Sequence, residues 1–292
     1  MPTSNPWARS ELIVVTGAST GMGAATAKEL AHRGFHVLAG VRREIDAEAL
    51  RGDGIEPRIL DVTVESDVAA IADRVAADPL GRPLRALINN AGIAVNAPVE
   101  ALPIAQWRRV FEVNLFGHVA MIQALMPALL RSSGTVVNIG SVGGKVALPT
   151  YPAYAGSKFA LEALSDSLRR EVNDLGVKVV VVQPGAVKTA MAERGVATTD
   201  LLKTDMTTDQ LGRYGDLIDA MSNLARSFDT DGVPAERAAK VIANAATAPR
   251  PRTRYTIGRD AAILVRLARV ASDRILDRVV RMVLRPHFTV NA

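Results

Sequence analysis

Short, uniformly apolar runs alternate along this chain with longer segments in which apolar residues recur about every 3.6 positions. Strands that are apolar throughout are typical of a parallel sheet covered on both faces, because each strand then buries both of its rows of side chains. The helical segments between them supply that cover. The runs that predict strands are 12–16, 35–41, 57–60, 86–89, 135–140, 178–183 and 254–257, and the clearest helical segments are 24–32, 68–76, 107–130 and 158–173.

A glycine-rich segment lies between the first predicted strand and an alanine-rich helix. Its first glycine permits a sharp turn, and the two later ones let backbone approach a pyrophosphate closely. The helix that follows offers free N–H groups and the positive end of its dipole to phosphates. We predict a dinucleotide cradle here, with a plain glycine-rich turn as the alternative. The predicted contact residues are Gly17, Ser19, Thr20, Gly21, Met22 and Gly23.

The end of the second predicted strand bears on which dinucleotide is bound. A protein that binds NAD usually places Asp or Glu there to hold the ribose 2′-OH. Here the strand ends in Val41-Arg42-Arg43, and the first carboxylate is Glu44. A guanidinium can hold a 2′-phosphate through charge-assisted hydrogen bonds. We therefore predict that Arg42 binds the cofactor and that NADP(H) is preferred over NAD(H); the alternative is a solvated pair of arginines that opens a helix.

These features together predict an α/β fold in one domain, a doubly wound parallel sheet of the Rossmann type with about seven strands and helices on both faces. The 292 residues, 48% of them hydrophobic, suffice for one such core. We predict that residues 1–10 form an arm and not a signal peptide. Residues 11–259 form the dinucleotide-binding and catalytic domain, including a lid or substrate loop at 190–231, and residues 260–292 form a C-terminal helical segment.

Tyr154 and Lys158 are four positions apart, so a helix places them on one face. A tyrosine normally titrates near ~10, and a cation held close lowers that pKa. Tyr154 can then give a proton to a carbonyl or take one from an alcohol. Tyr151 has only Ala155 at the same spacing, so we predict that it is a pocket or packing residue. Ser141 follows a strand end, where its hydroxyl can bond a substrate oxygen as charge develops on it.

In their order and spacing, several motifs of the chain from 11 to about 257 resemble the short-chain dehydrogenase/reductase family. The resemblance implies hydride transfer between NAD(P)(H) and a carbonyl or secondary alcohol. The runs 114–118 and 157–162 are similar to the branch of retinol- and steroid-type dehydrogenases. Gly156 departs from the family, which more often has Ala there, at a cost to the helix of about 1 kcal/mol. The motifs are the glycine-rich segment 16–23, Asn89-Asn90-Ala91-Gly92, Asn114, Ser141, Tyr154-x-x-x-Lys158 and Pro184-Gly185.

The resemblance also implies roles for single residues. Lys158 holds the nicotinamide ribose hydroxyls, and Asn114 holds a water that links Lys158 to solvent as a proton relay. Asp61 meets the adenine amino group with Val62 beside it, although a helix N-cap is the alternative for Asp61. For the asparagines after the fourth strand, a structural turn and direct cofactor contact are both open. The further predicted contacts are Asn90, Ala91, Gly92, Pro184, Gly185, Val187 and Thr189.

The loops beyond the carboxyl ends of the strands set the substrate in a fold of this kind. The loops at 93–99, 142–151 and 190–231 are rich in apolar residues. An apolar pocket favours a small hydrophobic carbonyl or alcohol of the steroid, retinoid or lipid type. The alternative is that these residues only pack the lid. The predicted pocket residues are Val95, Val142, Leu148, Tyr151 and Met191.

The C-terminal segment combines apolar residues with six arginines between 266 and 285. We expect it to dock on the body or on another subunit, with the arginine stems covering apolar surface, and we predict a homo-oligomer, a dimer or tetramer. Peripheral contact with an anionic membrane through 260–285 is the alternative. The apolar runs at 12–15 and 179–182 are too short to span a bilayer, so we predict no transmembrane segment and a cytoplasmic location.

Composition argues against other classes of function. The chain has no cysteine, and no two of its four histidines have a metal-binding spacing, so we expect no metal site. The net charge of +5 is spread along the chain and aromatic residues make up 4% of it, which argues against nucleic-acid binding. A regulator that senses NADP(H) without turnover remains the alternative from another class. Such a protein has no need of Tyr154 and Lys158, and both are present.

Overall fold

The computed structural model describes residues 10–288, so most of the predicted arm lies outside the described residues. Seven strands form one sheet in the order β3-β2-β1-β4-β5-β6-β7, and all neighbouring strands are parallel. The predicted fold class is confirmed, and each predicted strand is present with ends shifted by at most two residues. The strands are β1 (Leu12–Val15), β2 (His36–Val41), β3 (Ile55–Ile59), β4 (Leu84–Asn89), β5 (Thr135–Ile139), β6 (Lys178–Pro184) and β7 (Arg254–Ile257).

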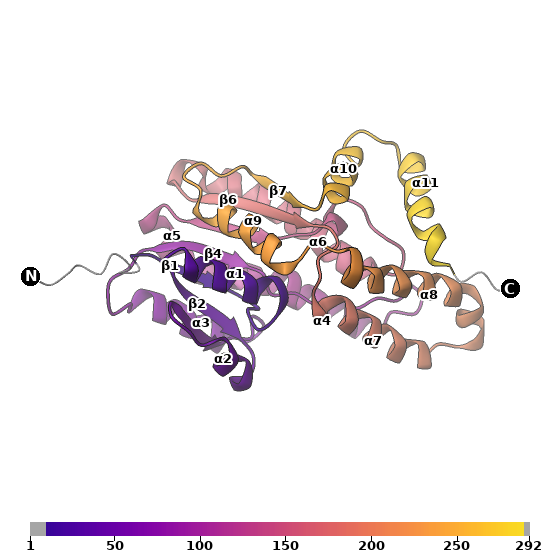
Figure 1. The fold of residues 1–292 in the computed structure, drawn as a ribbon, viewed down its shortest axis with the longest axis horizontal. Helices are drawn as coiled ribbons and strands as arrows, with labels where there is room; N and C mark the ends of the chain where they lie inside the picture. The colour runs from indigo at the N-terminus through magenta and orange to yellow at the C-terminus, as the bar shows by residue number, and fades with distance from the viewer. Residues whose placement is uncertain (1–9, 289–292) are drawn as a thin grey trace, which may run out of the picture.

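Each strand contributes side chains to two cores because its residues alternate between the faces of the sheet. In β1, Ile13 and Val15 pack on one face, and Leu12 and Val14 pack on the other. The first face is covered by α1 (Gly21–His32), α2 (Glu44–Leu50) and α9 (Ala235–Thr247), and Figure 1 shows α1 and α9 side by side. The second face is covered by α3 (Glu65–Ala76), α5 (Gly117–Ser132) and α6 (Pro152–Val172).

The single helix predicted over 107–130 is wrong in its middle. The structure has α4 (Ile104–Phe111), then a π-helical turn, η1 (Glu112–Phe116), and then α5. A π turn adds one residue to a helical turn and re-aims the side chains in it, a change that a 3.6-residue periodicity does not report. Asn114 lies in this turn and is fully buried.

Among the described residues, one helical stretch, Ile104–Ser132, is long and apolar enough to cross a membrane by composition alone. The core helix of a folded domain meets the same criterion. In this chain Met121, Leu125 and Leu129 of the stretch are buried against the second face of the sheet. The stretch therefore serves as a core helix of the domain in this structure.

The region predicted as a lid is a helical hairpin made of α7 (Ala190–Thr204) and α8 (Thr208–Asp231). Its two ends are joined by a β-bridge between Val187 and Val233. There the N–H of Lys188 donates to Val233 O at 3.0 Å, and the N–H of Val233 donates to Ala186 O at 2.9 Å. The chain therefore leaves the body of the domain and returns to it at adjacent positions beside β6.

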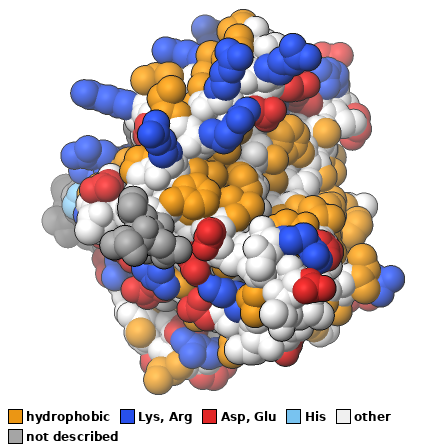
Figure 2. Space-filling model, turned by 90° about the vertical axis from the view of Figure 1, so that its right-hand side faces the viewer, with side chains coloured by type: hydrophobic (Ala, Val, Ile, Leu, Met, Phe, Trp, Pro, Cys, Tyr) orange, Lys and Arg blue, Asp and Glu red, His pale blue; other side chains and the backbone are white. Residues whose placement is uncertain are grey.

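The C-terminal segment forms two helices, α10 (Arg259–Leu267) and α11 (Asp273–Leu284). Leu284 is 3% exposed and packs against Met221 and Leu224 of α8, so α11 docks on the helical hairpin. Figure 1 places α7, α8 and α11 at one end of the molecule, and Figure 2 looks at that end. Hydrophobic side chains gather in the middle of this face, and Lys and Arg side chains surround its upper part.

Candidate active site

The carboxyl ends of β1 and β4 are tied together at the point where the strand order reverses, which is where ligands bind in open α/β sheets. Thr16 Oγ1 accepts hydrogen bonds from the N–H groups of Asn90 and Ala91, at 3.0 and 2.9 Å. Asn90 Nδ2 donates in return to the carbonyls of Thr16 and Gly17, at 3.0 and 2.9 Å. The Asn90 amide therefore has a structural role, and these bonds brace the floor of the crevice.

Two glycines of the predicted cradle lie where a side chain would clash with neighbouring atoms and where φ is positive. Gly17 has φ +63°, and a Cβ there would lie 2.7 Å from the Cα of Ala91. Gly21 has φ +56° and begins α1, and a Cβ there would lie 3.0 Å from Cγ2 of Thr189. Thr20 is the N-cap residue of α1, and its side chain makes no capping bond. The first amides of α1 therefore face the crevice at the positive end of the helix dipole.

Tyr154 and Lys158 lie in α6 as the spacing predicts. Lys158 is 4% exposed, and its Nζ donates to the carbonyl of Ile139 at 2.8 Å and lies 5.8 Å from the centre of the Tyr154 ring. A Cβ on Gly92 would lie 3.9 Å from Nζ, so the ammonium reaches the loop after β4. An ammonium has three donors, and one of them is used by the described residues. The other donors of this buried cation fit the hydroxyls of a ribose, as a nicotinamide dinucleotide would present them.

The pKa values of this pair differ in part from the sequence-based prediction. Burial raises the pKa of Tyr154, and a hydrogen bond with Ser141 opposes that rise. The predicted lowering of the Tyr154 pKa is therefore wrong for this structure, in which burial is the largest influence and raises the pKa. Burial also lowers the pKa of Lys158 to about 8. At neutral pH the pair thus holds a protonated phenol beside a largely charged ammonium, the form suited to giving a proton to a carbonyl.

Ser141 lies at the start of a 3-10 turn, η2 (Val142–Gly144), directly after β5. Its Oγ accepts a hydrogen bond from the N–H of Gly143 at 3.0 Å. A Cβ on Gly143 would lie 3.3 Å from both Ser141 Oγ and the ring of Tyr154. The two hydroxyl-bearing side chains therefore share one small region, and a side chain at Gly143 would be tightly packed against both.

Asn114 is held by hydrogen bonds to the loop after β4 and to α6. Its Oδ1 accepts from the N–H of Ile93 at 2.8 Å, and its Nδ2 donates to Ile93 O at 2.9 Å and to Ser157 Oγ at 3.1 Å. Both amide hydrogens are thus used within the protein, and Asn114 fixes the loop after β4 against α6. A Cβ on Gly92 would lie 3.4 Å from its Oδ1, on the side of Lys158. Through that oxygen Asn114 faces the same space as the ammonium of Lys158.

Two buried polar groups behind the site lie in the runs 114–118 and 157–162, but the sequence analysis assigned no role to either of them. The carboxylate of Glu162 accepts from Gln183 and Arg254 and pairs with Lys145 at 3.1 Å, directly behind the Ser141 turn. His118 is fully buried, its Nε2 is 2.8 Å from Ala91 O, and burial lowers its pKa to about 3. His118 is therefore neutral and donates to the loop after β4. Neither spacing matches a recognisable motif, because the contacts form only in the folded chain.

The end of the crevice predicted for adenosine lies at β2 and β3. Arg43 is paired with Asp46, with two hydrogen bonds of 2.7 Å, whereas Arg42 is exposed and has no ion-pair partner within residues 10–288. Asp61 Oδ1 accepts from the N–H and Oγ1 of Thr63, at 3.0 and 2.7 Å. The N-cap of α3 is Val64, so the N-cap alternative for Asp61 is wrong. Val62, which lies next to Asp61 after β3, is 6% exposed and packs against Gly117.

The segment after β6 lies on the opposite side of the cradle. Pro184 ends β6, the N–H of Gly185 donates to Ile257 O at 2.9 Å, and Thr189 is the N-cap of α7. The side chain of Val187 is buried in the core of the first face, so any contact with a ligand there is made by its backbone.

The predicted pocket residues fall into separate clusters. Val95 packs with the hydrophobic residues of α4 and the loop before it. Leu148 and Tyr151 pack against α8 and α11, and the rings of Tyr151 and Tyr154 meet edge to face at 6.1 Å. Val142 and Met191 are half-buried, next to Ser141 and in the first turn of α7. The structure thus brings Leu148 and Tyr151 together and keeps Val95 in its own cluster.

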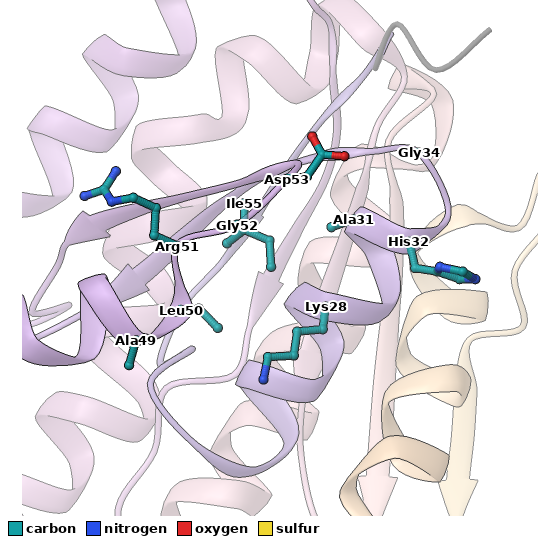
Figure 3. A pocket seen from close by; sticks show the side chains of 10 residues that line it. All are labelled: Lys28, Ala31, His32, Gly34, Ala49, Leu50, Arg51, Gly52, Asp53 and Ile55. Atoms are coloured by element: carbon teal, nitrogen blue, oxygen red, sulfur yellow. The ribbon is translucent and has the colours of Figure 1, made fainter.

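A separate hollow lies away from these residues. It has a volume of about 610 Å³ and opens between the end of α1 and the α2–β3 connection (Figure 3). None of the predicted site residues lines it; its walls include Lys28, His32 and Arg51. Within residues 10–288, no group of three or more His, Asp or Glu side chains could hold a metal ion.

Comparison with known proteins identifies this arrangement. A model of the short chain dehydrogenase family matches residues 11–200. The chain belongs to the short-chain dehydrogenase family. It is 35% identical over 266 residues to retinol dehydrogenase 16 from Homo sapiens, covering 88% of this chain and 83% of that protein. The resemblance to the retinol dehydrogenase branch is confirmed, and the protein is an oxidoreductase that acts on CH–OH and C=O groups with a nicotinamide cofactor.

Solved structures of this family agree with the fold. A short chain dehydrogenase from Burkholderia cenocepacia in complex with NADP has a TM-score of 0.73 at 25% identity, covering 93% of this chain and 98% of that one. A short chain dehydrogenase/reductase from Burkholderia phymatum in complex with NAD has a TM-score of 0.74 at 24% identity, with coverages of 89% and 93%. Members that are similar in fold thus occur with either dinucleotide.

Proposed function

We propose that this short-chain dehydrogenase prefers NADP(H) and interconverts a hydrophobic ketone or aldehyde and the corresponding alcohol, with Ser141, Tyr154 and Lys158 at the reacting oxygen. The observation that supports this most is the buried ammonium of Lys158, whose Nζ lies 5.8 Å from the centre of the Tyr154 ring. A regulator that only senses the cofactor has no use for a buried cation beside a tyrosine.

The roles of the residues follow from their donors and charges. The bound nicotinamide supplies or accepts the hydride. Tyr154 donates its proton to the substrate oxygen in reduction and accepts one in oxidation. The Ser141 hydroxyl donates to the same oxygen as negative charge develops. Lys158 stabilises the resulting phenolate electrostatically, and its unused donors hold the ribose. Asn114 keeps the loop after β4 in position and presents one oxygen toward Lys158 for a water that carries protons from solvent.

The preference for NADP(H) rests on Arg42. Its guanidinium is exposed at the end of β2 and, within the described part of the chain, is not engaged by a carboxylate, unlike its neighbour Arg43. A guanidinium in that position can fork onto a 2′-phosphate. The relative from Burkholderia cenocepacia that was solved with NADP is in keeping with this proposal.

We expect Arg42→Asp to reverse the cofactor preference. The new carboxylate repels a 2′-phosphate and can accept from a ribose 2′-OH. The ratio of kcat/KM with NADPH to that with NADH should fall by about 100-fold, the sum of roughly 1.5–3 kcal/mol lost for one cofactor and a gain for the other. Arg250→Asp makes the same charge change on an exposed residue of the connection that leads into the amino end of β7, at the edge of the sheet opposite the crevice, and is the control. An unchanged ratio in Arg42→Asp would remove Arg42 from the cofactor site.

The hydrophobic substrate class rests on the residues around Tyr154. Leu148 and Tyr151 present apolar surface beside the reacting tyrosine, against Met221 and Leu224 of α8. The human relative in this comparison is named a retinol dehydrogenase. We infer that the substrate is an apolar molecule of the retinoid, steroid or long-chain lipid type.

A substrate panel tests the proposed function. Turnover is followed by NADPH and NADH absorbance with retinoid, steroid, long aliphatic and small polar carbonyls, and with the matching alcohols. We expect kcat/KM to be at least tenfold higher for the large apolar members than for the small polar ones, because they bury more surface. Equal values across the panel would contradict a hydrophobic pocket. Tight NADPH binding without turnover of any member would favour the non-catalytic sensor.

The assembly and location of the protein are also proposals. We propose a cytoplasmic homo-oligomer in which α10 and α11 contribute to the subunit contact, since several of their apolar residues are exposed. The most exposed are Met282 of α11 and Ile263 of α10, at 71% and 66%, and Val270 in the connection between the two helices is 84% exposed. Peripheral contact of the same helices with a membrane is the competing arrangement, because arginines accompany these residues.

A further inference from the structure

One arginine of the helical hairpin reaches across to the cradle. Arg194 lies in the second turn of α7, and its Nε donates to the carbonyl of Ala190 at 3.0 Å. This bond turns the guanidinium back toward the beginning of α7. There Nη2 of Arg194 donates to Oγ1 of Thr20 at 3.4 Å. The side chain thus bridges the hairpin and the glycine-rich segment, which are 174 positions apart in the chain.

The guanidinium of Arg194 has more donors than its protein partners use. A guanidinium carries five N–H groups, and the contacts above use two of them. Within residues 10–288, no carboxylate lies within 4.0 Å of Arg194, whereas Arg213 of the same hairpin is paired with Glu100. An arginine that faces a neutral hydroxyl and keeps its remaining donors free fits an anion with several oxygens.

The position of Thr20 indicates where such an anion lies. Thr20 caps α1, whose first amides and positive dipole end face the crevice. On the other side, Thr189 contacts the position of Gly21 and leads directly into α7. Arg194 therefore stands over the end of α1 at which a dinucleotide pyrophosphate would be held.

We propose that Arg194 binds the pyrophosphate of the nicotinamide dinucleotide and thereby holds α7 closed over the bound cofactor. This inference rests on the proposed function. α7 is also fixed to the loop after β4, since Thr199 Oγ1 donates to Asn96 O at 2.9 Å. Cofactor binding therefore secures one wall of the substrate pocket before the substrate enters.

The adenosine 2′-phosphate is the competing position for this anion. The hydrogen bond from Arg43 is the main cause that lowers the pKa of Asp46, and the charges of Arg42 and Arg194 add smaller contributions, so Arg194 lies within electrostatic reach of this end of the crevice. NADH contains the pyrophosphate and lacks the 2′-phosphate, so a comparison of the two cofactors separates these positions.

Binding of NADPH and of NADH, measured by fluorescence titration, tests the proposal without any substrate. We expect Arg194→Ala to raise the Kd of both cofactors by a similar factor of about ten, and Arg194→Lys to raise it less, because a charge remains without the fork. Arg226→Ala, an exposed arginine of the same hairpin, should change either Kd by less than twofold. Loss for NADPH alone, or an unchanged Kd in Arg194→Ala, would overturn the assignment. A wild-type protein that binds neither cofactor would instead overturn the proposed function.

Hydrogen exchange tests the second half of the proposal. Saturating NADPH should slow amide exchange in 190–204 of the wild-type protein and slow it clearly less in Arg194→Ala at equal saturation. Equal protection in both proteins would show that α7 is held by other contacts and would overturn the closing role of Arg194.

Discussion

Tyr154→Phe is expected to reduce turnover by about 1,000-fold while it changes the Kd of NADPH by less than twofold. The variant removes one hydroxyl, the acid that protonates the substrate oxygen, and general acid–base catalysis contributes roughly 10²–10⁴-fold. The ring itself remains to fill the space beside Gly143 and Tyr151. We expect cofactor binding to persist because the proposed contacts of Lys158 and the glycine-rich segment with the cofactor are unchanged. Steady-state kinetics and a fluorescence titration on the same preparation measure both quantities.

The matched control for this variant is Tyr255→Phe. Tyr255 lies in β7, and its hydroxyl accepts from the N–H of Arg252 at 3.1 Å, so the same atom is lost outside the crevice. Turnover in the control should stay within twofold of the wild-type value. If Tyr154→Phe retained a tenth or more of the wild-type turnover, another group would have to be the acid.

Lys158→Met is expected to abolish measurable turnover and to remove a pH dependence of stability. Burial lowers the pKa of Lys158 from 10.5 to about 8 in the folded protein. Between these values the unfolded chain binds more protons than the folded chain, so the free energy of unfolding rises with pH. The penalty for burying the charge is complete below pH 8 and is relieved as the pH rises toward 10.5. Methionine is uncharged, so its contribution to the free energy of unfolding does not change with pH.

Urea unfolding at several pH values between 7 and 10 measures this effect. The difference in unfolding free energy between wild type and Lys158→Met should shift in favour of the wild type by roughly 2 kcal/mol over that range. The hydrogen bond to Ile139 that is lost in the variant changes the offset between the two curves but not their difference in slope. Parallel curves would mean that Lys158 titrates in the folded protein as it does in the unfolded chain.

The fold and the tight glycine-rich turn could be predicted from the sequence because each depends on local pattern. Apolar runs separated by helical periodicity determine a parallel sheet, and the steric demands at Gly17 and Gly21 are features of one short turn. The spacing of Tyr154 and Lys158 likewise becomes proximity on any helix. What was predicted wrongly depends on the surroundings: the direction of the Tyr154 pKa is set by burial from several elements.

The remaining errors and omissions have the same origin. The π turn that carries Asn114 differs from an α-helix by one residue, and hydrophobic periodicity does not resolve that difference. Glu162 and His118 are charged or titratable residues in apolar segments, and only their long-range partners reveal their roles. Arg194 and Thr20 are 174 positions apart, and no local rule connects them.

The β-bridge between Val187 and Val233 holds the two ends of the helical hairpin next to each other, so the hairpin is an insertion that joins the body at a single place. Because the chain leaves and returns at adjacent backbone positions, the geometry of the sheet does not depend on how many residues lie between them. Evolution or an engineer can therefore exchange residues 190–231 for a different hairpin and alter the substrate while β6, β7 and the catalytic face of α6 stay in register. A replacement hairpin would also need an arginine near Thr20 in place of Arg194. The segment that determines the substrate would then also determine part of the affinity for the cofactor.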